Sequence, residues 1–394
     1  MLRRYELKCI SCGSSYEADI WLMKCPNCSG LLEPKLREAL EASWELFRSR
    51  RFGVWRYREL LPQVTPVTMG EGGTPLIEVG SKLFVKFEGS NPTGSFKDRG
   101  MSVAVSLVRE AGIRSVVCAS TGNTAASMSA YAARANLKSF VILPRGKVAR
   151  GKLAQAALHG ATILEVEGSF DEALEAVMGA SGREISLYPL NSFNPWRLEG
   201  QKTLAYEIVD ELGVPDWVVL PVGNAGNISA VWKGFKELEG LGLVEEVPKL
   251  VGVQAEGASP IAKAYREGRE EPLFVESPET IATAIRIGKP VNWPKAMRAL
   301  RESDGLAVEV SDQEILEAQR KLGRMGIGVE PASASPYAAY LKLVGKEISL
   351  SDKVVLIATG HALKDPDVLP APNTLRVRSS DEAIALLREV VARG

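Results

Sequence analysis

The sequence predicts an α/β fold in which helices cover both faces of parallel sheets, and three observations lead to this prediction. Short runs rich in β-branched residues alternate with stretches of helical periodicity from about Leu83 onward. Glycine and small polar residues directly follow several of these runs, at the strand ends where parallel sheets collect ligands. The first 28 residues stand apart, because they hold four of the five cysteines. The runs expected to form buried strands are 115–118, 139–143, 162–166, 217–222, 250–254 and 353–358.

Length and charge limit the class of protein. With 394 residues, of which 45% are hydrophobic, the chain can bury a large core and is expected to form more than one domain. Lysine plus arginine equals aspartate plus glutamate at 48 each, so no basic surface indicates a nucleic-acid partner. The sequence shows no apolar run of about 18 residues and no signal-peptide pattern at Met1. We therefore expect a cytoplasmic protein with no membrane partner.

Two C-x2-C pairs predict a zinc ribbon over residues 1–32. The four cysteines are Cys9, Cys12, Cys25 and Cys28, with twelve residues between the pairs. Four thiolates can surround Zn²⁺ tetrahedrally, and a site closed by four cysteines is structural. Two disulfides or a redox-active pair are the alternatives. A cytoplasmic chain disfavours disulfides, and neither pair lies at a strand-to-helix junction. The fifth cysteine, Cys118, lies in an apolar run and is expected to be a small buried hydrophobe.

A linker helix is expected after the ribbon. Residues 33–50 place four large apolar side chains on one helical face, at Leu36, Leu40, Trp44 and Phe47. Such a face would dock on the main body of the protein.

Residues 91–100, N-P-T-G-S-F-K-D-R-G, place a lysine at the start of a helix. Ser95 and Asp98 have the spacing of a capping box, which would make Ser95 the N-cap and put Lys97 in the first turn. Apolar residues then repeat at helical spacing as far as Gly112. The positive end of the helix dipole disfavours a charged amine, so we expect the pKa of Lys97 below its usual value of about 10.4. Lys97 is a candidate for Schiff-base chemistry, and a solvated lysine after a turn is the alternative.

Three loops that follow expected strands carry candidate binding groups. Residues 120–127 open a helix with glycine, hydroxyls and an amide, a pattern that favours an anion site but also suits ordinary N-capping. Residues 223–227, G-N-A-G-N, can turn backbone amides toward a phosphate, although a G-x-x-G turn alone is weak evidence. Thr359 ends the last expected strand, which is a common place for a threonine.

The polar segment 191–203 carries two cations, several amides and hydroxyls just before a helix. Arg197 can bind a phosphate through two N–H groups, and Ser192 and Asn224 could add hydrogen bonds. A polar helix start with solvated charges is the alternative.

Together these motifs resemble those of the fold-type II pyridoxal-phosphate enzymes, the tryptophan synthase β family. The matching segments are 70–76, 91–100, 120–127, 191–203, 223–227 and 359–361. The resemblance implies pyridoxal 5′-phosphate as cofactor, two parallel-sheet α/β domains and a homodimer. Beside the ribbon at 1–32, the division that we expect is 33–83 for the linker helix and the start of the large domain, 84–190 for the small domain, and 191–394 for the rest of the large domain.

The resemblance also implies a role for each candidate residue. Lys97 would anchor the cofactor and, once displaced, would move protons. Asn123 would bind the 3′ oxygen of the cofactor, and Thr359 would be the neutral partner of its ring nitrogen, which makes the ring a weaker electron sink. The residues implied for the cofactor's 5′-phosphate are Gly223, Asn224, Ala225, Gly226 and Asn227. Those implied for the substrate are Ser120, Thr121 and Thr124 at its α-carboxylate, and Ser192, Arg197 and Asn224 at its phosphate.

Segment 191–203 is most similar to the branch of the family that acts on a phosphorylated amino acid. The implied activity is a carbon–oxygen lyase of threonine biosynthesis, which converts O-phospho-L-homoserine and water to L-threonine and phosphate by γ-elimination and β-hydration. Glu330 would lie near the ring or in an exposed loop, and Arg286 and Lys289 would lie near the mouth of the site. Two alternatives remain open: formation of cysteate from O-phosphoserine and sulfite, and a catalytically inactive zinc-ribbon interaction protein.

Overall fold

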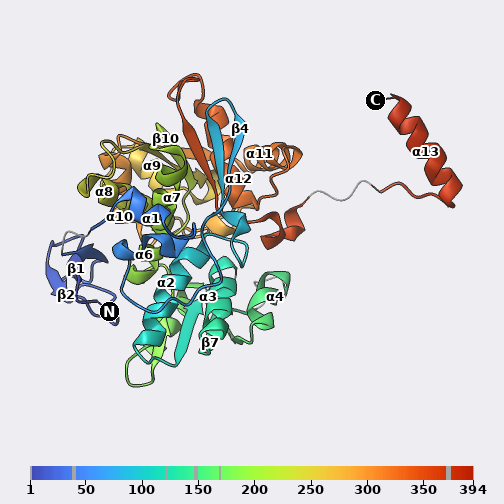
Figure 1. The fold of residues 1–394 in the computed structure, drawn as a ribbon. Coiled ribbons are helices and arrows are strands. Elements are labelled where there is room, and N and C mark those ends of the chain that lie inside the picture. The colour runs from blue at the N-terminus through green and yellow to red at the C-terminus, as the bar shows by residue number, and fades with distance from the viewer. Residues whose placement is uncertain are drawn as a thin grey trace.

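The computed structural model describes residues 2–37, 41–120, 122–145, 150–167, 170–369 and 374–393 (Figure 1). Two parallel sheets form the body, and a small antiparallel sheet precedes them along the chain. The prediction of an α/β fold with parallel sheets is therefore confirmed.

The N-terminal sheet consists of β1 (Tyr5–Cys9), β2 (Ser15–Glu17) and β3 (Leu32–Leu36), in the order β2-β1-β3. The linker helix predicted over 33–50 is wrong in its first part, because residues 32–36 pair with β1. Pro34 suits this edge position, since it has no N–H to donate to a second neighbour. The helical part is α1 (Trp44–Arg48), capped by the Ser43 hydroxyl, which accepts from the Leu46 amide at 3.1 Å. Leu40 lies outside the described residues.

The larger sheet has six strands in the order β12-β11-β10-β13-β5-β4. All neighbours are parallel except β4 and β5, which form an antiparallel hairpin. The strands are β4 (Leu76–Gly80), β5 (Leu83–Phe87), β10 (Trp217–Pro221), β11 (Lys249–Ala255), β12 (Leu306–Val310) and β13 (Val354–Ala358). Apolar clusters on both faces bury its central strands.

The smaller sheet is parallel throughout, in the order β8-β7-β6-β9. Its strands are β6 (Ser115–Ala119), β7 (Lys138–Pro144), β8 (Thr162–Val166) and β9 (Leu187–Pro189). The chain therefore leaves the larger sheet after β5 and returns to it at β10. Since β5 belongs to the larger sheet, we propose that the smaller domain begins after this strand and not at the predicted residue 84.

Helices cover both sheets, as Figure 1 shows. They are α2 (Lys97–Glu110), α3 (Asn123–Arg134), α4 (Arg150–Leu158), α5 (Phe170–Ala180), α6 (Pro195–Gln201), α7 (Thr203–Leu212), α8 (Gly226–Gly240), α9 (Pro260–Arg266), α10 (Trp293–Glu302), α11 (Asp312–Arg324), α12 (Pro331–Leu343) and α13 (Ser380–Arg393). Short 3₁₀ helices are η1 (Val54–Leu60), η2 (Glu88–Ser90), η3 (Glu256–Ala258), η4 (Thr283–Ile285), η5 (Ala362–Lys364) and η6 (Pro366–Val368).

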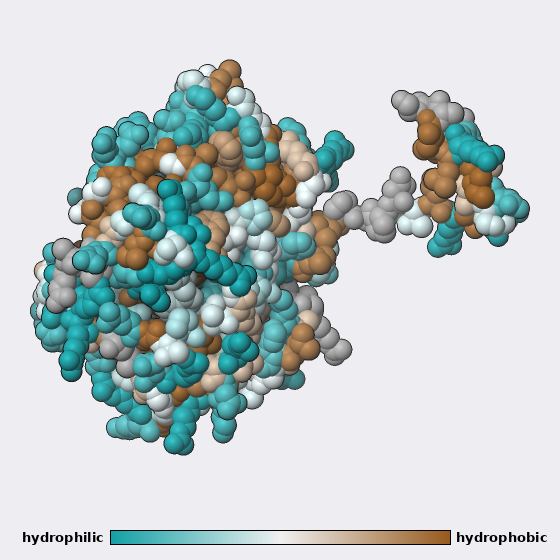
Figure 2. All heavy atoms as spheres, viewed as in Figure 1, coloured by the Kyte–Doolittle hydropathy of each residue, from teal (hydrophilic) through white to brown (hydrophobic). Residues whose placement is uncertain are grey.

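The C-terminal helix α13 lies apart from the body in Figure 1, and Figure 2 shows apolar side chains exposed along it. Among them, Leu387 and Val391 are 64% and 77% exposed. Within the described part of the chain, no helix combines the length and apolarity needed to cross a membrane.

Candidate active site

A cavity of about 210 Å³ lies where strand ends of the two sheets meet. Loops after β6, β10 and β13 line it, together with the first residues of α2 and one face of α6. The predicted site residues that it brings together are Lys97, Ser120, Asn123, Thr124, Ser192, Arg197, Gly223, Asn224, Ala225, Gly226, Asn227 and Thr359. Thr121 lies outside the described residues.

Lys97 is the first residue of α2, as expected, but the predicted capping box is wrong. Phe96 occupies the cap position with helical backbone angles and makes no side-chain cap bond. The Asp98 carboxylate instead accepts hydrogen bonds from the Thr93 amide at 2.7 Å, the Thr93 hydroxyl at 2.6 Å and the Ser127 hydroxyl at 2.6 Å. Asp98 thus stabilises the turn before the helix and ties it to α3.

Burial and, to a smaller extent, the nearby Arg197 cation together lower the pKa of Lys97 to about 7, although Glu330 opposes them. Its Nζ lies 4.2 Å from the centroid of the Phe96 ring. A large fraction of the amine is therefore neutral near pH 7, which is the form that attacks a carbonyl.

A fully buried ion cluster holds α2 against the larger sheet. Arg99 donates to both carboxylate oxygens of Glu88, at 2.6 and 2.7 Å, and to both of Glu207, each at 2.7 Å. Lys86 on β5 lies 3.2 Å from the same Glu207. Because every charge in this cluster has a partner, the helix that carries Lys97 has a defined position.

Glu330 forms part of the cavity wall and is 3% exposed. The Asn123 amide donates to both of its carboxylate oxygens, at 2.9 and 3.2 Å. Burial raises the pKa of Glu330 to about 7, against the lowering effects of Lys364 and of the Asn123 hydrogen bond. A Cβ atom on Gly360 would lie 2.3 Å from Glu330 Oε1, so only glycine leaves room for this carboxyl.

The loop before α8 forms a concave nest of backbone amides. Ala225 has left-handed backbone angles, with φ of 62°, an unusual conformation for a residue other than glycine. The first amides of α8 have no partner inside the helix and lie at its positive end. Both polar side-chain atoms of Asn227 are buried and lack a hydrogen-bond partner among the described residues. A bound anion in this nest would supply the missing acceptor.

Arg197 and Gln201 leave further polar atoms unpaired in the cavity wall. The Arg197 Nη1 donates to the Leu190 carbonyl at 3.0 Å, but its Nε and the Gln201 Oε1 find no partner in the described part of the chain. Burial lowers the pKa of Arg197 to about 10. A buried cation that no carboxylate neutralises favours an anionic ligand.

The second cation of segment 191–203 does not reach the cavity. Lys202 is fully buried on the far side and pairs with Glu199 at 2.6 Å and Glu237 at 2.7 Å. Arg197, the residue of this segment that is expected to bind a phosphate, is the cation that the segment offers to the cavity.

Thr359 and His361 follow β13. The Thr359 hydroxyl lies 2.9 Å from that of Ser333, which also accepts from the Gly360 amide at 2.7 Å. The His361 Nδ1 accepts from the Leu363 amide at 3.1 Å and so caps the η5 turn. His361 therefore stabilises a turn.

Two further cavity residues do not belong to the predicted site. Lys364 donates to the Thr93 carbonyl at 3.0 Å and to the Gln155 side chain on α4. Gln201 reaches the cavity from the last turn of α6. Lys364 belongs to no recognised motif, and Gln201 lies within segment 191–203 but has no predicted role there. Long-range packing brings both to the site.

The four N-terminal cysteines form one cluster, in which all Sγ atoms lie within 4.8 Å of one another. The Cys9–Cys28 and Cys12–Cys25 pairs are 3.5 and 3.6 Å apart. Tetrahedral ligands at about 2.3 Å from a zinc ion lie about 3.8 Å from each other, so these thiols fit such an ion. A Cβ on Gly30 would approach the Cys9 and Cys28 sulfurs to 3.1 Å, which explains the glycine.

Cys118 is fully buried, as predicted, and burial raises the pKa of its thiol to about 12. It is therefore no nucleophile. Arg286 is exposed at the cavity, whereas Lys289 pairs with Glu276 at 3.1 Å.

Comparison with known proteins agrees with this geometry. Residues 67–360 match the family described as pyridoxal-phosphate dependent enzyme. The chain is 50% identical over 399 residues to threonine synthase of Methanocaldococcus jannaschii, covering 96% of each chain. It is 49% identical over 405 residues to threonine synthase of Methanosarcina acetivorans, covering 98% of each. The solved structure of threonine synthase from Escherichia coli has a similar fold, with a TM-score of 0.73 over 98% of this chain and 99% of that one, at 20% identity.

Proposed function

This chain belongs to the family of pyridoxal-phosphate-dependent enzymes, and we propose that it converts O-phospho-L-homoserine and water to L-threonine and phosphate. Two relatives that are 50% and 49% identical to it are named threonine synthase. The observation that carries the proposal is Arg197, a buried cation that faces the cavity and whose Nε has no hydrogen-bond partner among the residues that the structure describes. A substrate that bears its own phosphate satisfies this group. An unphosphorylated amino acid leaves it unpaired.

The residues of the cavity fit the cofactor. The nest at Ala225 and the unpaired amide of Asn227 suit its phosphate, Lys97 suits its aldehyde, and the Thr359 hydroxyl suits its ring nitrogen. When bound, pyridoxal phosphate supplies an electron-withdrawing ring that makes protons next to the substrate's amino group acidic.

Different residues of the chain then move protons and bind the phosphate and the carboxylate of the substrate. The amine of Lys97 accepts the proton from Cα and moves a proton at Cβ. Arg197, Ser192 and Asn224 hold the phosphate and stabilise its growing negative charge while the Cγ–O bond breaks. Ser120 and Thr124 hold the α-carboxylate at the positive end of α3, and the same role for Thr121, outside the described residues, stays a prediction from the sequence. After the phosphate has left, a proton is returned to Cγ, which becomes the methyl group of threonine. Water then adds its oxygen to Cβ and gives up one proton, and Cα regains a proton.

Two finer points belong to the same proposal. The four-cysteine cluster binds Zn²⁺ in a closed, structural site. The homodimer implied by the family stays a prediction, which the mass of the purified protein in solution tests.

The direct test supplies purified protein and pyridoxal phosphate with O-phospho-L-homoserine. We expect L-threonine and phosphate in equal amounts. Arg197→Met should raise KM for this substrate about a hundredfold, because a charge-assisted double hydrogen bond is lost. Lys289→Met, which removes an exposed cation, is the matched control and should leave KM unchanged. Absence of threonine, with cysteate formed from O-phosphoserine and sulfite, would contradict the proposal.

A further inference from the structure

Helix α6 has two functional faces. Arg197, Leu198 and Gln201 line the cavity, while Trp196 and Glu199 point the other way and are fully buried. The guanidinium of Arg197 has a single direct hydrogen bond, to the Leu190 carbonyl, among the described residues. Its direction therefore depends on how the helix itself is held.

The N-terminal ribbon, residues 2–36, packs on the far face of α6. The Tyr5 and Trp196 rings meet edge to face, with centroids 5.6 Å apart and an interplanar angle of 81°. Both rings belong to one continuous apolar cluster that also contains Leu7, Cys9 and Leu32 of the ribbon. Removing the ribbon would thus expose the back of the helix that carries Arg197.

A second contact joins α6 to strand β3. Lys233 on α8 donates to the Pro34 carbonyl at 2.6 Å and also pairs with Glu199. Lys295 on α10 donates to the Leu32 carbonyl at 2.9 Å, and Arg298 pairs with Glu33 at 2.9 Å. The backbone of β3 is therefore part of the buried polar network around Glu199.

The metal-binding cluster connects directly to these contacts. Tyr5, Leu7 and Cys9 occupy the same inward face of β1, where burial alternates along the strand. Cys9 also pairs with Leu32 of β3. A three-stranded ribbon of this size buries too little core to hold its shape without a metal.

We propose that the ribbon is a positioning device for the anion site, in which the metal cluster holds β1 and β3, and these hold α6 so that Arg197 points into the cavity. Tyr5, Trp196 and Lys233 are positioning residues, since none of them lines the cavity. This inference rests on the proposed role of Arg197 in binding phosphate.

The test measures the affinity for inorganic phosphate, by equilibrium dialysis, beside the affinity for pyridoxal phosphate. In Tyr5→Ala the dissociation constant for inorganic phosphate should rise about tenfold, because a small misplacement of a binding group has effects of this order or larger. Affinity for pyridoxal phosphate should stay within about twofold, because its expected nest lies on α8. Tyr5→Phe, which keeps the ring and loses only the hydrogen bond to the Leu60 carbonyl, should resemble the parent protein.

Removal of the metal should likewise weaken the binding of inorganic phosphate and leave the binding of pyridoxal phosphate unchanged. Protein treated with a chelator, or carrying Cys12→Ser together with Cys28→Ser at the two exposed ligands, should bind inorganic phosphate more weakly and keep its cofactor. Unchanged phosphate affinity in Tyr5→Ala and in the metal-free protein would overturn the inference. An equal loss of affinity for pyridoxal phosphate and for inorganic phosphate would also overturn the inference, since the ribbon would then support the whole fold.

Arg197→Met separates this inference from the proposed function. If Arg197→Met weakens phosphate binding and Tyr5→Ala does not, the positioning inference alone is wrong. If Arg197→Met leaves phosphate binding unchanged, the proposed anion site is wrong, and the inference falls with it.

Discussion

Lys97 and Glu330 line the same cavity, and burial brings both pKa values to about 7 from opposite directions. Each group affects the other, because the carboxylate favours the charged amine and the ammonium favours the charged carboxylate. Arg197 acts on Lys97 in the opposite sense to Glu330. The three residues together set the fraction of Lys97 that is neutral near physiological pH.

Two substitutions should therefore shift the titration of Lys97 in opposite directions. Covalent uptake of pyridoxal phosphate by the cofactor-free protein needs the neutral amine, so its rate should fall as the pH drops below about 7. Arg197→Met removes a charge that lowers the pKa of Lys97, so the uptake rate should begin to fall at a higher pH. Glu330→Gln removes a charge that raises the pKa of Lys97, so the uptake rate should begin to fall at a lower pH. Stopped-flow absorbance at several pH values measures both shifts. Shifts of the same sign in the two variants would contradict this account. As a control, Lys97→Ala should show no covalent uptake of pyridoxal phosphate.

At the scale of elements, strand β3 is held by a buried carboxylate. Burial alone would raise the pKa of Glu33, but Lys295, followed by Lys35 and Arg298, outweighs burial and holds the pKa well below its usual range. A group whose pKa is depressed in the folded state stabilises the protein above its unfolded pKa of about 4.3. That contribution is lost as the pH falls below this value.

Glu33→Gln should therefore destabilise the attachment of the ribbon and flatten its dependence on acid pH. We expect a loss of about 3 kcal/mol at pH 7, because the buried cation Lys295 is left without the carboxylate that neutralises it. Hydrogen exchange of β3 amides between pH 3 and 7, a range that includes the unfolded carboxyl pKa of about 4.3, follows the effect. Glu17→Gln is the control, since Glu17 forms an exposed pair with Arg37 and should cost less than about 1 kcal/mol. Equal effects of the two substitutions would argue against a buried role for Glu33.

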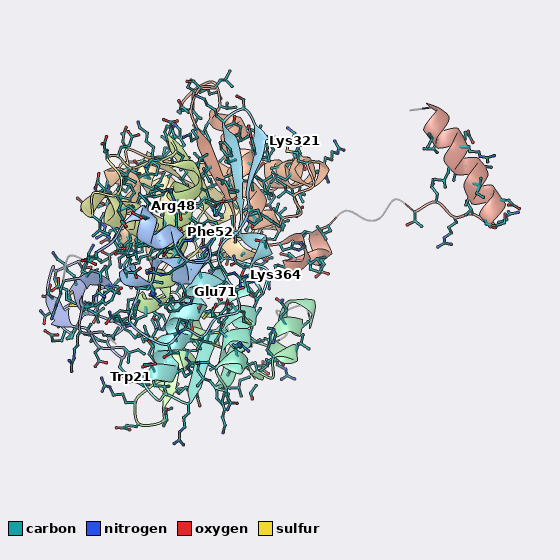
Figure 3. All side chains as sticks on the ribbon, in the orientation of Figure 1. Trp21, Arg48, Phe52, Glu71, Lys321 and Lys364 are labelled. Atoms are coloured by element: carbon teal, nitrogen blue, oxygen red, sulfur yellow. The ribbon has the colours of Figure 1, made fainter. Side chains whose placement is uncertain are left out.

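At the scale of the whole molecule, Lys364 joins the parts built on the two sheets. It follows β13 of the larger sheet, yet its amine donates to Gln155 on α4, which packs beside the smaller sheet. Figure 3 shows Lys364 and Glu71 at the level where the upper and lower parts of the body meet. A single side chain thus crosses the cavity region between the two parts.

Removing this connection should loosen α4 relative to the larger sheet. Lys364→Met deletes the charge-assisted hydrogen bonds to the Thr93 carbonyl and to Gln155. Because the second of these holds α4, the amides of this helix should exchange about tenfold faster, which corresponds to about 1.4 kcal/mol. Lys321→Met is the control, because Lys321 is exposed on α11, as Figure 3 shows. Mass spectrometry of peptides from α4 measures the rates, and unchanged exchange would show that Lys364 does not couple the two parts.

The sequence predicts well those strands that form short runs of mostly apolar residues. The six expected strands lie within about one residue of β6, β7, β8, β10, β11 and β13. The edge strand β8 is among them although it is mostly exposed, whereas the edge strands β4 and β12 escape prediction. The helical spacing of Leu36 and Phe47 misleads for a different reason, because pairing of β3 with β1 overrides the local pattern.

The sequence by itself determined the α/β class, the cysteine cluster and the loops of small residues at strand ends, because turns, caps and burial leave local patterns. Tertiary structure alone decided which charged side chains face the cavity. Arg197 and Lys202 lie on one short segment, yet one faces the cavity while the other is neutralised by Glu199. Glu330 and Lys364 come from distant parts of the chain, and their environment depends on contacts with Asn123 and Gln155. The charge state and the direction of a buried group depend on long-range packing, and no local sequence pattern encodes either of them.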